Sequence, residues 1–206
     1  MKARWGSVAL VTAGLMFLLY PAIRPWHDET TVAGARESMT SSAWVAAHFF
    51  GMLGFIAVTL GLLAVHRVIH SRLSQAALLT MWIGAGLTLP YYGAEDFGLH
   101  AIARSGVPDL LTVVDQVRYQ PLAATIFAVG LILLAVGGIL TAVAAWRTRA
   151  LSRPAALVFA IGFALFIPQF YFPAGIRIAH GVLVAIGCCW LAISLWTTDR
   201  RVARLD

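Results

Sequence analysis

The sequence predicts an all-α, polytopic membrane bundle with six transmembrane helices, and three observations lead to this prediction. Hydrophobic residues make up 60% of the 206 residues and charged residues only 12%, with a mean hydropathy of +0.83. Apolar segments of about 20 residues recur, which is the length that a helix needs to cross the hydrocarbon core. The charged residues collect between these segments. A soluble domain of this length cannot bury so large an apolar fraction.

We expect a single membrane-embedded domain, residues 1–206, without a linker or low-complexity segment. The predicted spans cover about 8–23, 44–65, 75–96, 122–146, 154–173 and 178–196. Their length and continuous apolarity favour helices, because barrel strands would alternate between apolar and polar residues. Proline recurs at the outer ends of odd-numbered spans, as at Pro21, Pro90 and Pro173. Each proline removes a backbone donor, so these helix ends can separate and leave a cavity.

The first predicted span resembles the start of a signal peptide, because Lys2 and Arg4 precede it. No small-residue cleavage site follows it, and the segment from Tyr20 to Trp26 is typical of a helix end at the aromatic belt of a membrane. We therefore expect this span to be retained. In the last span Cys188 and Cys189 are adjacent, which excludes a disulfide framework and a thiolate metal site.

The basic residues predict the orientation of the bundle through the positive-inside rule. Ten lie on the side of the two termini and five on the other side, and the ten are Lys2, Arg4, Arg67, Arg72, Arg147, Arg149, Arg153, Arg200, Arg201 and Arg204. Both termini should therefore be cytoplasmic, in the plasma (inner) membrane. This asymmetry accounts for the formal net charge of +6, which gives no reason to expect a nucleic-acid partner. Anionic lipid would suit the inner face.

The outer connections differ in character. Residues 24–43 are polar, and we expect them to be partly irregular. Residues 108–119 place Leu110, Val114 and Val117 at helical spacing, which predicts a short interfacial helix. This helix is interpreted either as a lid over a site or as a surface helix without a functional role.

The third predicted span ends in a segment that combines two adjacent carboxyls, two phenols and an imidazole. Residues four apart share a helix face, so Tyr92, Asp96 and His100 form one stripe and Tyr91 and Glu95 its neighbour. Charge in or near lipid is unfavourable and usually functional. The alternative is that both carboxyls lie in the headgroup zone, where tyrosine is also enriched. Continuation of the apolar pattern beyond residue 96 favours the functional interpretation.

Other spans bring polar and aromatic residues to the same depth, because odd spans end and even spans begin at the outer leaflet. The candidate catalytic residues are Glu95, Asp96, His100, His48 and His180. The candidate substrate-binding residues are Tyr91, Tyr92, Phe97, Trp26, Trp44, Phe166, Gln169, Phe170, Tyr171 and Arg177. The two carboxyls would be acid and counter-charge in either order, the histidines a proton relay or terminal base, and the aromatic rings would stabilise positive charge.

These residue types favour acid–base chemistry on a lipophilic substrate. A carboxyl that protonates an alkene or epoxide must stay neutral until it reacts, and the resulting carbocation needs aromatic faces and a dry pocket. The sequence has no Asp-rich motif for a metal-bound diphosphate. We expect no metal and no cofactor, an isoprenoid substrate and membrane lipid as partners, and the oligomeric state stays open.

The acidic and aromatic segment from Pro90 to His100 resembles the small integral-membrane terpene cyclases, namely the fungal meroterpenoid cyclases and the bacterial enzymes of drimentine-type indole-terpenoid pathways. The shared features are a small helical membrane chain, carboxyls near helix ends and the lack of a metal motif. The fungal enzymes have seven spans, one more than predicted here. The resemblance implies a metal-free, proton-initiated (class II-like) terpene cyclase with Glu95 or Asp96 as the proton donor.

Three alternatives from other classes remain. The two carboxyls with His100 and Arg177 would suit a proton- or ion-coupled transporter or channel-like protein, although the inner half lacks polar residues that would continue a pathway. His48, His100 and His180 with a carboxylate would suit a metal or haem enzyme. The last alternative is a subunit or lipid-binding module without chemistry.

Overall fold

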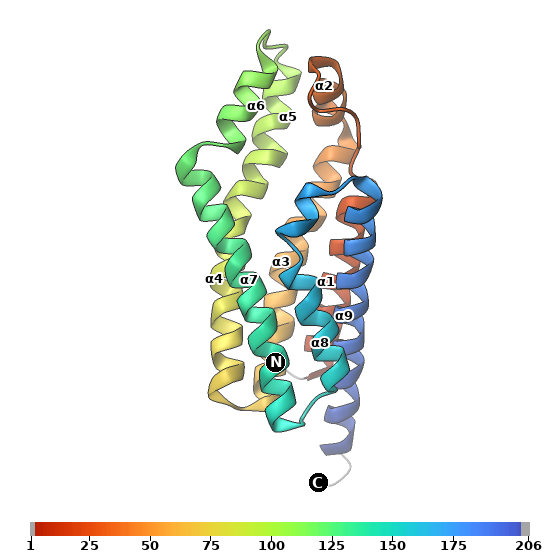
Figure 1. The fold of residues 1–206 in the computed structure, drawn as a ribbon. Helices are drawn as coiled ribbons and strands as arrows, with labels where there is room; N and C mark the ends of the chain where they lie inside the picture. The colour runs from red at the N-terminus through yellow and green to blue at the C-terminus, as the bar shows by residue number, and fades with distance from the viewer. Residues whose placement is uncertain (1–2, 203–206) are drawn as a thin grey trace.

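The computed structural model describes residues 3–202, with side chains for residues 3–198, and every regular element in this part is a helix (Figure 1). In chain order the elements are α1 (Ala3–Ile23), α2 (Val32–Thr40), α3 (Ser42–Ile69), α4 (Arg72–Gly93), the π-helix η1 (Ala94–Gly98), α5 (Leu99–Arg104), α6 (Leu110–Arg118), α7 (Pro121–Thr148), α8 (Arg153–Ala164), the 3-10 helix η2 (Pro168–Tyr171) and α9 (Ala174–Val202). The predicted all-α class is confirmed.

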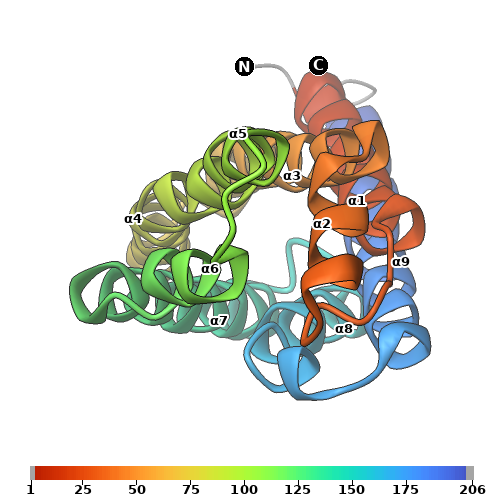
Figure 2. The same ribbon diagram turned by 90° about the horizontal axis from the view of Figure 1, so that it is seen from above.

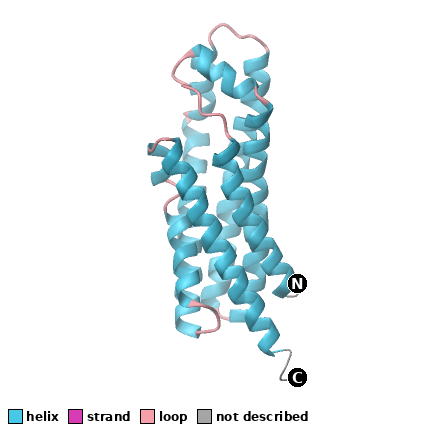
Figure 3. Ribbon diagram, turned by 90° about the vertical axis from the view of Figure 1, so that its right-hand side faces the viewer, coloured by secondary structure: helices cyan, strands magenta, loops and turns pink. Residues whose placement is uncertain are grey.

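Six helices form a closed ring, in the order α1, α3, α4, α7, α8 and α9 (Figures 1 and 2). Each helix packs against the one before and the one after it, and α9 returns to pack against α1. The start of α1 and the end of α9 lie at the same end of the bundle (Figures 1 and 3). The basic residues with described side chains separate between the two ends as predicted, while the side chains of Lys2, Arg200, Arg201 and Arg204 lie outside the described part.

Five helices within the described residues are long and apolar enough to cross a membrane. They are α1, α3, α7, the described part of α9, and the continuous helix Arg72–Arg104. These helices indicate a membrane-embedded protein. The segment predicted as a span at 154–173 differs, because α8 has only 12 residues and is followed by a turn and η2. Twelve residues rise about 18 Å, less than the hydrocarbon thickness of about 30 Å, and Pro168 and Pro173 prevent a regular continuation.

Three short helices, α2, α5 and α6, extend beyond one end of the ring (Figures 1 and 2). We call them the cap. They enclose a second hydrophobic core with the first turn of α3, and its fully buried members include Met39, Trp44, Leu99 and Leu110. The predicted interfacial helix at 108–119 is thus α6, and it packs into this core. The cap gives the molecule a compact structure outside the hydrophobic part of the bundle.

The connection at 24–43 is partly irregular, as expected: residues 24–31 contain no helix, and α2 forms at Val32–Thr40. The Thr31 side chain accepts a hydrogen bond from the Gly34 backbone N–H at 3.1 Å and begins the helix. Arg36 then donates to the backbone carbonyls of Ala103 at 2.6 Å and Val107 at 2.9 Å, which joins α2 to α5 and to the loop after it. The helix is therefore stabilised by tertiary contacts that a local polar pattern does not predict.

The third predicted span also extends past its expected end at residue 96. Helix continues without a break through η1 and α5 to Arg104, 33 residues in all, or about 50 Å. This length exceeds the hydrocarbon core by about 20 Å, so the end that carries α5 projects into the cap. Leu99 and Ala103 are buried in the cap core, which gives the extension its stabilising contacts.

Small residues allow close approach between neighbouring helices of the ring. A Cβ atom added at Gly84 of α4 would lie 2.8 Å from the backbone oxygen of Gly130 in α7. One added at Gly187 of α9 would lie 2.7 Å from the Cα of Phe159 in α8. The blocking atoms belong to backbone, so a larger residue would have to push the helices apart.

We expect Gly84→Ala to lower the free energy of unfolding by about 1–3 kcal/mol, because the methyl group overpacks the α4–α7 interface. The matched control is Gly86→Ala on the same helix, where an added Cβ meets nothing within 4 Å and the higher helix propensity of alanine favours the variant by up to about 1 kcal/mol. Thermal unfolding in detergent measures both. Equal stability of the two variants would contradict the close packing of α4 against α7.

Candidate functional site

Four charged side chains form a chain of ion pairs where the ring meets the cap, and we call them the charged layer. Arg118 Nε and Nη2 donate to the two carboxylate oxygens of Glu95 at 2.6 and 2.9 Å. Arg118 Nη2 also lies 2.9 Å from Glu29, and Glu29 pairs with Arg24 at 2.6 Å. All four side chains are largely buried. Two positive and two negative charges therefore cancel within the layer.

The elements hold these charges in fixed positions. Glu95 lies in the π-helix η1, and π-helices, although rare in proteins, often occur at functional sites. The backbone oxygen of Glu95 accepts a hydrogen bond from the indole Nε1 of Trp44 at 2.9 Å. Arg118 is the last residue of α6. Burial alone would lower the pKa of Arg118, but the carboxylates of Glu95 and Glu29 raise it above the ordinary arginine value. Arg118 therefore stays charged, and its two N–H donors hold the Glu95 carboxyl in position.

Asp96, next to Glu95, has a different environment. Asp96 is 0% exposed as a residue, whereas Glu95 is 8% exposed. Within the described residues neither carboxyl oxygen of Asp96 has a hydrogen-bond partner. The imidazole of His100, one turn along the helix, acts electrostatically on this carboxyl. The two adjacent carboxyls are thus separated into a paired one and an unpaired one, and neither lies free in bulk water.

Aromatic side chains fill the interior of the six-helix ring, on the side of the charged layer that faces away from the cap. We call them the aromatic cluster: Phe17, Tyr20, His48, Phe55, Tyr91, Tyr92, Phe127, Phe159, Phe163, Phe166, Phe170 and His180. Neighbouring aromatic side chains of this cluster contact one another. Their ring centroids lie 4.0 to 6.3 Å apart, and most pairs have edge-to-face or tilted geometry. Of the predicted substrate-binding residues, Tyr91, Tyr92, Phe166 and Phe170 belong to it.

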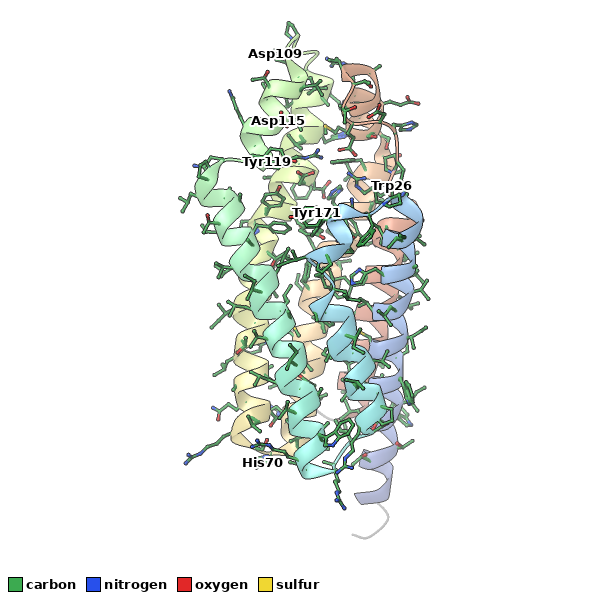
Figure 4. The ribbon with its side chains drawn as sticks, in the orientation of Figure 1. Trp26, His70, Asp109, Asp115, Tyr119 and Tyr171 are labelled. Atoms are coloured by element: carbon green, nitrogen blue, oxygen red, sulfur yellow. The ribbon has the colours of Figure 1, made fainter. Side chains whose placement is uncertain are left out.

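Three other predicted binding residues lie outside this cluster. Phe97 is 59% exposed and Tyr171 is 85% exposed, and Trp26 contacts the Arg24 guanidinium, which lies 4.5 Å from its ring centroid. Trp44 lies at the edge of the cluster, because its ring centroid is 4.4 Å from that of His48 and 4.9 Å from the Arg24 guanidinium. Figure 4 shows Trp26 and Tyr171 near the junction of ring and cap, Asp109 and Asp115 on the cap, and His70 at the opposite end.

The three candidate histidines each bond to a backbone carbonyl. His48 Nδ1 lies 2.9 Å from Trp44 O, His100 Nδ1 lies 2.7 Å from Met39 O, and His180 Nε2 lies 2.8 Å from Gly162 O. Because a carbonyl only accepts, these nitrogens carry hydrogen and the opposite ring nitrogen is free to accept in the neutral form. His100 thereby joins α5 to α2, and His180 joins α9 to α8. Among the described residues no group of three or more His, Cys, Asp or Glu side chains is placed to hold a metal ion.

Two hollows differ in place and character. One of about 10 Å³ lies beside the aromatic cluster, lined by residues that include Tyr20, Gln169, Arg177 and His180, and has room for roughly one water molecule. The other, of about 440 Å³, is apolar and lies between α7 and α8 toward the end where the chain passes from Arg147 to α8. The larger hollow is remote from the carboxyls, so we place the candidate site at the smaller one and the charged layer.

Sequence reasoning missed several members of this arrangement. Arg118 and Glu29 are absent from the predicted site residues. Phe17, Phe55 and Phe127 were not distinguished from other apolar residues. Nothing local in the sequence marks the Arg118–Glu95 pair, since the partners are 23 residues apart on different elements.

Comparison of this chain with known protein families, with curated proteins and with solved structures gives no match. Its function is therefore argued from the site itself.

Proposed function

We propose that this protein is a membrane-embedded, acid-catalysed isomerase or cyclase that acts on a lipophilic isoprenoid. The observation that carries the proposal is Asp96, a fully buried carboxyl without a described partner beside Glu95, which Arg118 pairs with through two N–H donors. A buried carboxylate without a partner is unfavourable, and this favours the protonated form of Asp96. Two neighbouring carboxyls in contrasting environments provide the separation of roles that acid catalysis requires. Asp96 is the acid in this proposal and Glu95 the fixed counter-charge.

The proposed reaction conserves all atoms of the substrate. The Asp96 carboxyl transfers its proton to one carbon of an alkene, which leaves a carbocation on the other carbon. The π electrons of a second alkene attack this cation and form a carbon–carbon bond. Loss of a proton from a neighbouring carbon to an acceptor such as the free nitrogen of His100 gives the product, and return of that proton to Asp96 restores the enzyme.

The aromatic cluster supports this proposal, because ring faces stabilise a carbocation without adding to it as a nucleophile would. Tyr92 lies one turn before Asp96 on the same helix and joins rings of α1, α3 and α7. The rings are closely packed, and the hollow beside them holds about 10 Å³. The site must therefore widen to admit a substrate, and in this proposal it does so by movement of the cap, which the Arg118 ion pairs join to η1 and to the 24–31 loop.

We further propose six crossings with both termini cytoplasmic, in which α8 and η2 together make the fifth crossing. After Cys188→Ala and Cys189→Ala, single cysteines at exposed positions test this with an impermeant maleimide on intact cells. Ser105→Cys on the cap and Tyr171→Cys at η2 should react, whereas Thr148→Cys at the end of α7 should react only after permeabilisation. Labelling of Thr148→Cys in intact cells would reverse the orientation. Protection of Tyr171→Cys would remove the fifth crossing.

Conversion of a substrate tests the proposed chemistry directly. Membranes that carry the protein are incubated with prenylated indoles and quinones and with simple isoprenoids, and mass spectrometry with chromatography detects products of unchanged mass. We expect a new isomer that membranes without the protein do not form. No isomer from any of these substrates, together with ion flux in liposomes, would favour the transport alternative.

A further inference from the structure

Arg177, in the first turn of α9, is the one arginine at the junction of ring and cap that has no carboxylate partner among the described residues. Arg24 and Arg118 are paired with Glu29 and Glu95. Arg177 instead donates from Nε to the neutral side-chain oxygen of Gln169 at 3.0 Å. Arg177 therefore carries a positive charge that no carboxylate among the described residues pairs with directly.

Aromatic rings hold the Arg177 side chain in place. Its guanidinium lies 4.8 Å from the ring centroid of Trp26 and 5.0 Å from that of Phe170. The indole of Trp26 is fixed by a 2.9 Å bond from Nε1 to the backbone oxygen of Pro21, and it also carries the guanidinium of Arg24 at 4.5 Å. Contacts to ring faces leave the edge of a guanidinium, where its N–H groups lie, free to bind an anion.

The small hollow beside Arg177 has a polar wall and an apolar wall. Arg177, Gln169 and the phenol of Tyr20 supply polar groups, while Phe17 and Phe166 of the aromatic cluster supply apolar surface. Room for about one water marks a place that a single oxygen-bearing group can occupy. This arrangement fits an anionic head followed by an apolar tail directed into the cluster.

We infer that Arg177 binds an anionic group of the substrate, so that the substrate class is an isoprenoid carboxylate or phosphate. This inference rests on the proposed function, because it assigns the substrate of the same site. A charge-assisted, two-point contact from arginine explains why this position holds a guanidinium rather than an apolar residue at a partly buried place. It also orients the tail toward Tyr92 and Asp96.

Binding of farnesoic acid and of its uncharged methyl ester to the purified protein in detergent tests the inference. We expect the wild-type protein to bind the acid at least about tenfold more tightly than the ester. Arg177→Gln should bind both equally, and Arg177→Lys should keep part of the preference. Arg104→Gln removes a positive charge from an exposed position on the cap and should leave the preference unchanged.

Equal affinity of the wild-type protein for the acid and the ester would overturn the inference, and this comparison needs no variant to fold. A preference that persists in Arg177→Gln would also overturn it. Displacement of farnesoate by phosphatidylglycerol at equal concentration would assign Arg177 to a lipid headgroup instead of a substrate. Asp96→Asn should bind farnesoate like the wild type, so loss of the charge preference and loss of acid catalysis are separate results.

Discussion

Asp96→Asn is expected to reduce the rate of isomer formation by about 10²- to 10⁴-fold, because the amide keeps the shape of the side chain but has no acidic proton to transfer. The folded state should tolerate this change. Neither oxygen of Asp96 has a described partner, so the exchange breaks no hydrogen bond, and we expect the free energy of unfolding to change by less than about 1 kcal/mol. Product formation and thermal unfolding are measured on the same preparations.

Asp115→Asn is the matched control for this experiment, because it makes the same chemical change at an exposed position of α6. We expect wild-type activity from it. Glu95→Gln should behave differently from both, since it weakens the bidentate contact with Arg118 and so lowers stability as well as activity. Wild-type turnover by Asp96→Asn would remove the acid from this position and with it the proposed mechanism.

Arg118→Gln is expected to lower the free energy of unfolding by about 3 kcal/mol, because it leaves the largely buried carboxylate of Glu95 without a cation and removes one of the two arginines that pair with Glu29. For a chain of this size the corresponding fall in Tm is roughly 10 °C. The loss should be greatest in the cap, where α6 is joined to η1 by the Glu95 contact and to the 24–31 loop by the Glu29 contact. Unfolding in detergent gives the Tm, and hydrogen exchange shows which helices lose protection.

Arg104→Gln serves as the control for Arg118→Gln, because this exposed residue of α5 should change the stability by no more than about 0.5 kcal/mol. The double variant Arg118→Gln with Glu95→Gln should lower the free energy of unfolding by less than the sum of the two single decreases, and the difference should be about 1 kcal/mol or more. Strict additivity would show that the 2.6 Å contact contributes no coupling energy.

The sequence predicted the helices of the ring better than the elements that join them. At three of their four ends, α3 and α7 differ from the predicted spans by two to four residues, and at the fourth by one. A long apolar run has no stable state in lipid other than a helix. The amphipathic spacing of Leu110, Val114 and Val117 likewise predicted α6. The length of α8 was overestimated, because Pro168 and Pro173 act within an apolar run that hydropathy alone treats as continuous.

The candidate site was predicted in part. The acidic and aromatic end of the third span indicated Glu95 and Asp96, and neither extends freely into water. Their order of roles was not predictable, because both are carboxyls at neighbouring positions and only their surroundings differ. Arg118 decides that difference from another helix, and the buried position of Asp96 results from the packing of η1 against α3 and α6.

The amino-acid sequence by itself determined that this chain is helical, that it is embedded in a membrane and that its ionisable residues concentrate toward one end. These properties follow from local quantities, namely apolar run length, residue spacing and the charge of connecting segments. Only the tertiary structure decided which carboxyl is paired, which arginine is left without a counter-charge and where the aromatic rings meet. Those outcomes depend on distances between residues far apart in the chain, and burial and pairing act over a few ångströms in space whatever the separation in sequence.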